Sequence, residues 1–356
     1  MRVLLLGGTG AIGRNLAKIL SSMGCETVVT SRQKRISNND DIAYVQGNAK
    51  DIGFLNDILG QNWDAIVDFM VWSTDEFSGI ADRFLGSTDQ YVFISTYRVY
   101  DHSPLITEDC PRLLDSTNDR EFLATDDYAL AKARCENILF SSPKRGWTII
   151  RPSIVYDGSG RFDLGVLASG VWLWRAQHHI TIPFPEEMLH KETTMTWGGD
   201  VARMIARILG KSESLGEVYT AATSSCISWK EVAAAYQEVI PFLLKLYPLD
   251  IFERAKGDLY QIRYDRMFDR VVDNSKIMRA TGLVQDDLVN PKEGLRHAVR
   301  EYLESGVELR PRVGENARMD RLVGGMPSLS PLIDSKAGAS QVVRYLARRS
   351  SLLDSL

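Results

Sequence analysis

Three glycines spaced three residues apart follow a short apolar run at the start of the chain. Residues 3–6 have the composition of a buried parallel strand, and Gly7, Gly10 and Gly13 come after them. In this pattern the first glycine permits a tight turn, the second lets a pyrophosphate approach bare backbone, and the third lets a helix pack closely on the strand. The helix N-terminus would face the anion with unpaired N–H groups and the positive end of its dipole. The segment therefore predicts a strand, a phosphate-binding turn and a helix, with an ordinary strand-to-helix turn as the alternative for the motif alone.

Strand and helix patterns alternate through the first 150 residues. A helix is expected over residues 12–23, and Gly24 is expected to end it as its cap. This alternation predicts an α/β fold of the Rossmann type, a doubly wound parallel sheet whose ligands bind at the carboxyl ends of the strands. The expected strands are residues 2–6, 26–30, 43–46, 65–71, 91–95 and 147–150.

The second half of the chain predicts a smaller domain that is interleaved with returns to the sheet. A helix is expected over residues 198–209 and a strand over 217–221, and Ser228 with Glu231 has the spacing of a capping box that opens another helix. Beyond about residue 310 the composition shifts to Arg, Gly, Ser and Pro, which predicts an extended segment over 311–335 and a short basic helix over 341–353. The expected domains are residues 1–165, residues 166–310 and a C-terminal extension over 311–356.

The charge and cysteine content exclude several classes of protein. A net charge of -4 gives no basic footprint, so nucleic acid is not an expected partner. No apolar run approaches the roughly 20 residues of a membrane span. The first segment has the pattern of a strand rather than a signal peptide, and the cysteines lack the spacing of a disulfide framework or a metal site. We expect a reduced, cytoplasmic protein that holds no metal.

A second group of reactive side chains lies about ninety residues after the glycines. The apolar run over 91–94 ends in the hydroxyls of Ser95 and Thr96, and Tyr128 precedes Lys132 by four residues. On a helix, a phenol and an ammonium four residues apart share one face. The positive charge of Lys132 favours the phenolate of Tyr128, which suits the tyrosine to proton exchange near neutral pH. A half-buried tyrosine above a solvated lysine is the alternative for this pair alone.

The order of these features resembles the extended branch of the short-chain dehydrogenase/reductase superfamily, which contains nucleotide-sugar epimerases, reductases and dehydratases. The resemblance is good to about residue 160 and thin beyond it. It implies that Thr96 hydrogen-bonds the substrate oxygen, with Ser95 as the alternative hydroxyl. It further implies that Tyr128 exchanges the hydroxyl proton, that Lys132 holds the nicotinamide ribose, and that the protein forms a homodimer as relatives often do. The matching residues are 7–13, 94–100, Glu108, Tyr128 with Lys132, and 151–156.

The resemblance also implies where the dinucleotide lies. Members that prefer NAD place an acidic residue at the end of the second strand, where it accepts hydrogen bonds from the ribose hydroxyls. Residues 30–35 contain no acid here, whereas Ser31 can donate to a 2′-phosphate and Arg32 can pair with it. NADP is therefore expected in preference to NAD. The expected cofactor contacts are Gly7, Thr9, Gly10, Ala11, Ile12, Gly13, Ser31, Arg32, Asn48, Met70, Lys132 and Pro152.

Departures from the family pattern narrow the expected reaction. Dehydratases of this group carry an Asp-Glu pair after the strand-end threonine, but this chain has Tyr97 and Arg98 there. Epimerases usually keep NAD bound, whereas net reductases exchange NADPH. The basic end of the second strand therefore favours an NADP-dependent oxidoreductase that reduces a keto sugar, with epimerisation second. A dinucleotide-binding scaffold or sensor without catalysis is the alternative from another class.

The expected substrate is a nucleotide-linked sugar. Many members hold the nucleotide diphosphate with an asparagine two residues after the Arg-Pro pair, and Ile154 replaces it here. The expected substrate contacts are Thr96, Tyr97, Arg161 and Arg266. Arg175, His190 and Arg263 are further side chains able to pair with a pyrophosphate, although a structural role is the alternative for each of them.

Overall fold

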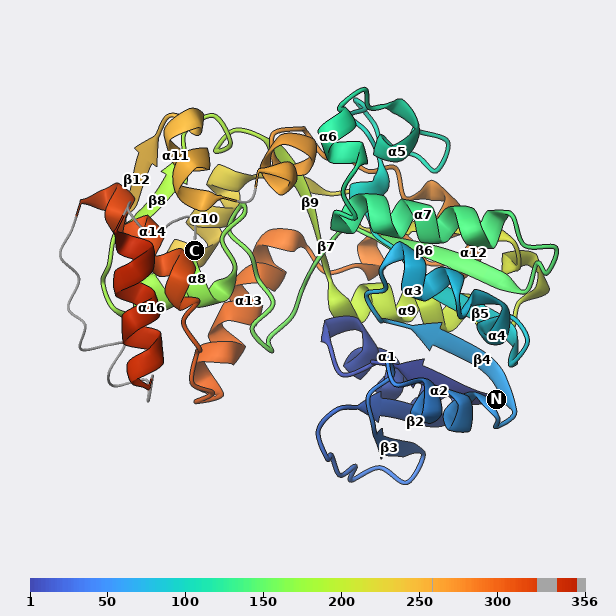
Figure 1. Ribbon diagram of the computed structural model, residues 1–356. Coiled ribbons are helices and arrows are strands. Elements are labelled where there is room, and N and C mark those ends of the chain that lie inside the picture. The colour runs from blue at the N-terminus through green and yellow to red at the C-terminus, as the bar shows by residue number, and fades with distance from the viewer. Residues whose placement is uncertain (258, 325–337, 351–356) are drawn as a thin grey trace. The chain divides into compact units, whose positions relative to one another are not determined.

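The computed structural model describes residues 1–257, 259–324 and 338–350 (Figure 1). The chain divides into two compact units. Unit 1 comprises residues 1–155, 194–225 and 271–289, and unit 2 comprises the described parts of residues 156–193, 226–270 and 290–356. Unit 1 is thus assembled from three separate stretches, so the predicted interleaving is present. The first break falls after residue 155, ten residues before the expected boundary.

Unit 1 is built on a sheet of seven strands that all pair in parallel. Their order across the sheet is β10-β6-β5-β4-β1-β2-β3. The chain therefore builds outward from β1 in one direction and then returns to build from β4 in the other, which confirms the predicted doubly wound fold. The strands are β1 (Arg2–Leu6), β2 (Glu26–Ser31), β3 (Ile42–Gln46), β4 (Trp63–Asp68), β5 (Thr88–Ile94), β6 (Trp147–Pro152) and β10 (Glu217–Ala221).

Helices cover both faces of this sheet because its central strands are apolar on both sides. Val3 and Leu5 of β1 pack into one cluster, and Leu4 and Leu6 pack into the other, as the twofold alternation of a strand requires. The first cluster contains α1 (Ala11–Ser22), α9 (Gly198–Ile208) and α12 (Ser275–Thr281). The second contains α2 (Ile52–Leu59), α3 (Thr74–Ser78), α4 (Ala81–Phe84) and α7 (Tyr128–Phe140). The short helices α5 (Leu113–Ser116) and α6 (Arg120–Leu123) precede α7.

Most element boundaries in unit 1 lie within one to three residues of the predicted ones. Gly24 adopts the left-handed conformation (φ 73°) just after α1, as expected for a glycine that ends a helix. The prediction of a strand over 65–71 is wrong at its end, because β4 stops at Asp68. The carboxylate of Asp68 accepts a hydrogen bond from the backbone N–H of Met70 (2.8 Å), which turns the chain out of the sheet.

Unit 2 is mainly helical around an aromatic core. The rings of Trp172 and Tyr236 stack with centroids 4.4 Å apart, and Phe162 meets both rings edge-on. The predicted capping box is present, because Ser228 and Glu231 exchange side chain-to-backbone hydrogen bonds at the start of α10. Its elements are α8 (Ser169–Gln177), β8 (Ile182–Pro185), α10 (Trp229–Gln237), β12 (Leu244–Tyr247), α11 (Leu249–Lys256), α13 (Pro291–Glu304), α14 (Val313–Val323) and α16 (Ala339–Arg349). The strands β7 (Ile154–Tyr156), β9 (Glu192–Trp197) and β11 (Cys226–Ser228) lie where the chain passes between the units.

The described part of the C-terminal region contains helices at 313–323 and 339–349. The prediction of an extended segment over 311–335 is wrong for residues 313–323, which form α14; residues 325–337 lie outside the described part. Ala317 of α14 and Tyr345 of α16 are buried with Trp174, and this apolar contact explains why the helix forms despite many polar residues. The basic helix predicted over 341–353 is present as α16, over Ala339–Arg349; residues 351–353 lie outside the described part. Within the described residues, no helix combines the length and apolar character that a membrane crossing requires.

Candidate active site

The carboxyl ends of five neighbouring strands bring the predicted site residues into one row. Pro152 ends β6, Thr96 follows β5, Met70 follows β4, Gly7 follows β1 and Ser31 ends β2. The direction of chain building reverses between β1 and β4, so the row crosses the switch point where ligands of open parallel sheets bind. From β2 to β5 there are three strand spacings, about 14 Å in all. An extended dinucleotide can therefore follow this edge.

The three glycines after β1 have different structural roles. Gly7 has φ 70°, and its N–H donates to the hydroxyl of Thr30 (2.8 Å), which fixes the turn against β2. A Cβ at Gly13 would lie 2.3 Å from the carbonyl oxygen of Gly8, so only glycine lets α1 pack this closely on the turn. A Cβ at Gly10 would meet no atom within 4 Å. The fold thus requires Gly7 and Gly13, whereas Gly10 leaves open space beside the helix.

The N-terminus of α1 is suited to an anion. Gly10 occupies the cap position and is exposed, no side chain caps the helix, and its first turn contains no acidic residue. The N–H groups of the first turn, which begins with Ala11 and Ile12, are left for an external acceptor. Thr9, at the tip of the turn, is half-buried. Together with the space beside Gly10, this arrangement fits the pyrophosphate of a dinucleotide.

The end of β2 carries positive rather than negative side chains. The hydroxyl oxygen of Ser31 accepts from the N–H of Gln33 (3.2 Å), so its own O–H can donate to a ligand. Arg32 is exposed. Asn48, after β3, is also exposed, and its side-chain oxygen accepts from the N–H of Lys50 (3.2 Å), which leaves its amide N–H groups for an adenine.

Thr96 is held with its hydroxyl hydrogen free to donate. It caps the short 3-10 turn over Tyr97–Val99, and its hydroxyl oxygen accepts from the N–H of Arg98 (3.2 Å). Ser95, the alternative hydroxyl, is only 2% exposed and donates to the buried carboxylate of Glu136 (2.6 Å). The geometry therefore favours Thr96 over Ser95 as the hydroxyl that meets a substrate.

Tyr128 and Lys132 occupy the first turns of α7. Asp127 caps this helix, and Tyr128, its first residue, is half-buried with the Arg98 guanidinium 5.4 Å from its ring centroid. The Lys132 ammonium donates to the carbonyl oxygens of Met70 (3.0 Å) and Ile94 (2.7 Å), which uses two of its three N–H groups. Burial lowers the pKa of Lys132, while the nearby Asp68 carboxylate opposes that shift. A cation is thus fixed beneath the ends of β4 and β5.

Comparison with known proteins places the chain in a family. A model of the NAD dependent epimerase/dehydratase family matches residues 3–222. The chain belongs to this family. No curated protein matches the chain in sequence. The family name gives NAD as the cofactor and epimerisation or dehydration as the reactions.

Solved structures of two epimerases and of a further NAD-bound enzyme share the fold. An epimerase from Methanothermobacter thermautotrophicus has 18% identity and a TM-score of 0.66, covering 85% of this chain and 92% of that chain. The Bordetella bronchiseptica enzyme WbmH, in complex with NAD+, has 17% identity and a TM-score of 0.64, with 86% and 99% covered. The UDP-glucose 4-epimerase of Thermus thermophilus, in complex with NAD, has 20% identity and a TM-score of 0.64, with 86% and 100% covered.

In this member of the epimerase/dehydratase family, two buried acidic residues lie near the row of strand ends. They were not predicted from the sequence. Asp68 at the end of β4 accepts hydrogen bonds from the hydroxyl of Tyr91 (2.6 Å) and the indole N–H of Trp72 (2.7 Å). It also accepts from the N–H of Met70, the residue whose carbonyl oxygen receives Lys132. Burial raises the pKa of Asp68, and these hydrogen bonds oppose the shift. The sequence signal was a carboxylate that ends an apolar strand.

Glu136 is the second unforeseen acid. It lies one turn after Lys132 on α7, is fully buried, and forms a two-pronged ion pair with Arg151 of β6 (2.9 and 2.7 Å). It also accepts from Ser95 after β5 and from Arg112 (3.1 Å). Glu136 therefore ties the Tyr/Lys helix to the ends of two strands and fixes its position over the row. The signal was the Lys-x-x-x-Glu spacing, which places both residues on one helix face.

We expect Glu136→Gln to lower the free energy of unfolding by about 3 kcal/mol, because it leaves the buried Arg151 guanidinium without its counter-charge. Urea denaturation followed by circular dichroism measures the loss. Glu231→Gln is the matched control, since Glu231 pairs with Lys292 at the surface and such pairs contribute about 1 kcal/mol or less. Equal losses in the two variants would show that the Glu136 network does not hold the helix.

The expected substrate residues have less favourable positions. Tyr97 is 1% exposed, so its ring belongs to the interior of unit 1. Arg266 in unit 2 is 4% exposed; it pairs with Asp265 and donates to the carbonyl oxygen of Gly165 (3.0 Å). Arg161, also in unit 2, is exposed. Arg175 is buried and pairs with Asp320 (2.8 Å). Arg161 keeps its side chain accessible to a ligand, whereas Tyr97, Arg266 and Arg175 fill interior positions.

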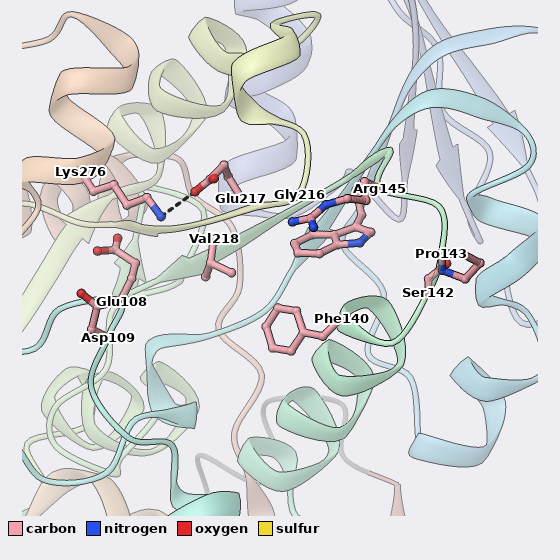
Figure 2. Close-up of a pocket in the computed structure, with 11 residues that line it drawn as sticks. Glu108, Asp109, Phe140, Ser142, Pro143, Arg145, Gly216, Glu217, Val218 and Lys276 are labelled. Carbon is pink, nitrogen blue, oxygen red and sulfur yellow. Dashed lines mark ion pairs between the residues drawn. The ribbon is translucent and has the colours of Figure 1, made fainter.

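A pocket of about 580 Å³ in unit 1 lies away from the row of strand ends (Figure 2). It lies at the amino ends of the edge strand β10, which Glu217 begins, and of its neighbour β6, which Trp147 begins. Figure 2 shows the Lys276 ammonium directed at Glu217, with which it pairs at 2.8 Å. Because ligands of parallel sheets bind at the carboxyl ends, we do not assign this pocket to the cofactor or substrate.

Proposed function

We propose that the protein is an NADP-dependent oxidoreductase that acts on a keto or hydroxyl carbon of a nucleotide-linked sugar, and that it reduces a 4-keto sugar. The observation that carries this proposal is the row of strand ends in unit 1. It combines a glycine turn open to phosphate, a strand-end hydroxyl at Thr96, the Tyr128 and Lys132 pair, and a β2 end without an acid. A bound nicotinamide would supply hydride transfer to or from the substrate carbon.

The residues of the row have separate roles in this reaction. The N-terminus of α1 and the space beside Gly10 hold the pyrophosphate. Thr96 donates its O–H to the substrate oxygen, and Tyr128 gives that oxygen a proton as the carbonyl becomes a hydroxyl. Lys132 supplies the positive charge that stabilises the phenolate left on Tyr128. Asp68 and Glu136 act indirectly, because they position Lys132 and its helix.

The preference for NADP rests on charge at the end of β2. The O–H of Ser31 and the exposed guanidinium of Arg32 can both meet a 2′-phosphate, and no carboxylate is present in residues 30–35 to accept from a bare ribose. NADPH that reduces a substrate must leave as NADP+ and be replaced at each turnover. The exposed position of Arg32 suits this exchange, because the cofactor does not have to enter an enclosed site to reach it.

Epimerisation with a retained NAD is the second candidate. It is favoured by the family match and by the NAD-containing structures of WbmH and of the Thermus thermophilus UDP-glucose 4-epimerase. Incubation of the protein with NADPH and a panel of nucleotide-linked 4-keto sugars separates the two. Loss of nicotinamide absorbance with each product formed supports reduction. Interconversion of sugar epimers with no net loss of absorbance supports epimerisation, and no turnover with bound dinucleotide supports a scaffold.

We expect Arg32→Ala to weaken NADPH binding by about 1.5–3 kcal/mol, the range for hydrogen bonds to charged groups, and to leave NADH binding nearly unchanged. Calorimetric titration of both cofactors measures the difference. Lys18→Ala, at an exposed position of α1, removes the same charge from the same unit and is the control. If Arg32→Ala weakens both cofactors equally, Arg32 does not read the 2′-phosphate.

A further inference from the structure

Unit 2 contains a hollow of about 410 Å³ between α14 and α16, which pack side by side (Figure 1). Four arginines line it, two from the start and first turns of α14 and two from α16. The lining includes one acidic residue, Glu315. The arginines are Arg312, Arg318, Arg344 and Arg348.

The single carboxylate among the described residues of the lining is already shared. Glu315 pairs with Lys256 (2.9 Å), and its other oxygen lies 3.5 Å from Arg312. Asp320, one turn further along α14, is engaged with Arg175 (2.8 Å) and with the hydroxyl of Tyr345 (2.6 Å). Both acids of α14 are therefore engaged with groups other than Arg344.

The arginines of α16 lie over the positive end of α14. A Cβ at Gly314, in the first turn of α14, would lie 3.7 Å from Nε of Arg344 and 3.7 Å from Cγ of Arg348. No side chain in the described part of the chain caps the N-terminus of this helix. Cations at a helix N-terminus are repelled by the dipole and by the unpaired N–H groups, whereas an anion there is attracted by both. Glu315 in this first turn supplies one negative charge against the four guanidinium groups of the lining, so a further anion among them would be stabilised.

Two of the arginines have hydrogen-bonding capacity left. Nε of Arg318 is buried and has no hydrogen-bond partner among the described residues. Arg344 forms no ion pair with a carboxylate in the described part of the chain. Each guanidinium presents a planar fork of donors that matches two oxygens of a phosphate.

We propose that this hollow binds a diphosphate group, either free or as part of a small phosphorylated molecule. Four guanidinium groups around one helix N-terminus provide charge for two phosphates, and the concave shape suits a compact ligand. An extended polyanion is disfavoured, because the whole chain has a net charge of -4. The site does not depend on the proposed function, since its residues belong to unit 2 and lie outside the region 3–222 that matches the family.

Calorimetric titration of the full chain with inorganic pyrophosphate, inorganic phosphate and UDP tests the proposal. The double substitution Arg344→Ala with Arg348→Ala is expected to weaken pyrophosphate binding at least tenfold. The double substitution Arg254→Ala with Arg300→Ala removes the same charge from exposed positions of unit 2 and is expected to change the affinity less than twofold. NADPH affinity is expected to stay the same in both, which separates this site from the glycine turn.

UDP can also bind at the proposed nucleotide-sugar site, so only the binding that the Arg344/Arg348 substitutions remove is compared. Within that part, tighter binding of pyrophosphate than of UDP would identify the free anion as the ligand, and the reverse would identify an esterified diphosphate. If the alanine variant does not fold, the double substitution Arg344→Lys with Arg348→Lys takes its place. It conserves the charge and removes only the planar guanidinium groups, which should weaken pyrophosphate binding several-fold. Three results would overturn the proposal: no pyrophosphate binding at millimolar concentration, equal binding in the Arg344/Arg348 and Arg254/Arg300 variants, or tighter binding of a single-stranded oligonucleotide than of any diphosphate.

Discussion

Replacing Tyr128 by phenylalanine should lower turnover about 10²- to 10⁴-fold, the range for a lost general acid, and leave the free energy of unfolding nearly unchanged. Tyr128 is the first residue of α7 and is half-buried, so phenylalanine keeps the ring and its contact with the Arg98 guanidinium. NADPH affinity should also persist, because the glycine turn and Lys132 are untouched. Steady-state turnover of the sugar identified in the screen, with urea denaturation in parallel, measures both effects.

Tyr44→Phe is the matched control for Tyr128→Phe. Tyr44 is a half-buried tyrosine of β3 in the same unit, and it does not belong to the row of strand ends. Loss of the Tyr44 hydroxyl should leave turnover within about twofold of that of the unsubstituted protein. Near-normal turnover in Tyr128→Phe on the true substrate would rule out the proposed proton transfer, and the scaffold would then be the better description.

Gly10→Val should abolish dinucleotide binding while the fold survives. The backbone at Gly10 has φ -86°, which any residue adopts, and a Cβ there meets no protein atom within 4 Å. The branched side chain would instead fill the space that we assign to the pyrophosphate. We expect affinity for NADPH and NADH to fall at least a hundredfold in calorimetric titrations, with an unfolding midpoint close to that of the unsubstituted chain.

Gly13→Ala provides the contrast, because its Cβ would strike the backbone of Gly8 at 2.3 Å. That variant should be destabilised, since α1 must move away from the turn. A Gly10→Val protein that still binds dinucleotide with normal affinity would mean that the three glycines form only a structural turn.

The fold of unit 1 could be predicted because its signals are local. Apolar runs of four to six residues, each followed by a turn or a cap, fix a parallel sheet whatever the details of packing. The end of β4 was missed because a side chain decides it: Asp68 draws the N–H of Met70 out of the ladder. Helix α14 was missed because its propensity is weak, and contacts with Trp174 and Tyr345, distant in sequence, stabilise it.

The placement of the candidate site residues could be predicted where each residue follows a strand or shares a helix turn with its partner. Thr96 and the pair Tyr128 and Lys132 are of this kind. The partners of Lys132 could not be predicted, because they are the backbone carbonyl oxygens of Met70 and Ile94. Every residue has such a group, so no residue type marks it in a sequence. The resemblance to the family already favours Thr96 over Ser95, and the hydrogen bond from Ser95 to Glu136 agrees with that preference.

Because unit 1 is made of three separate stretches, its sheet is completed late in biosynthesis. N-terminal segments leave the ribosome first, so β1 to β6 emerge while residues 156–193, which belong to unit 2, still separate them from β10. The outer side of β6 then carries unpaired backbone N–H and C=O groups until residues 217–221 arrive. In the interval between the synthesis of β6 and that of β10, this open edge is available for pairing with another chain.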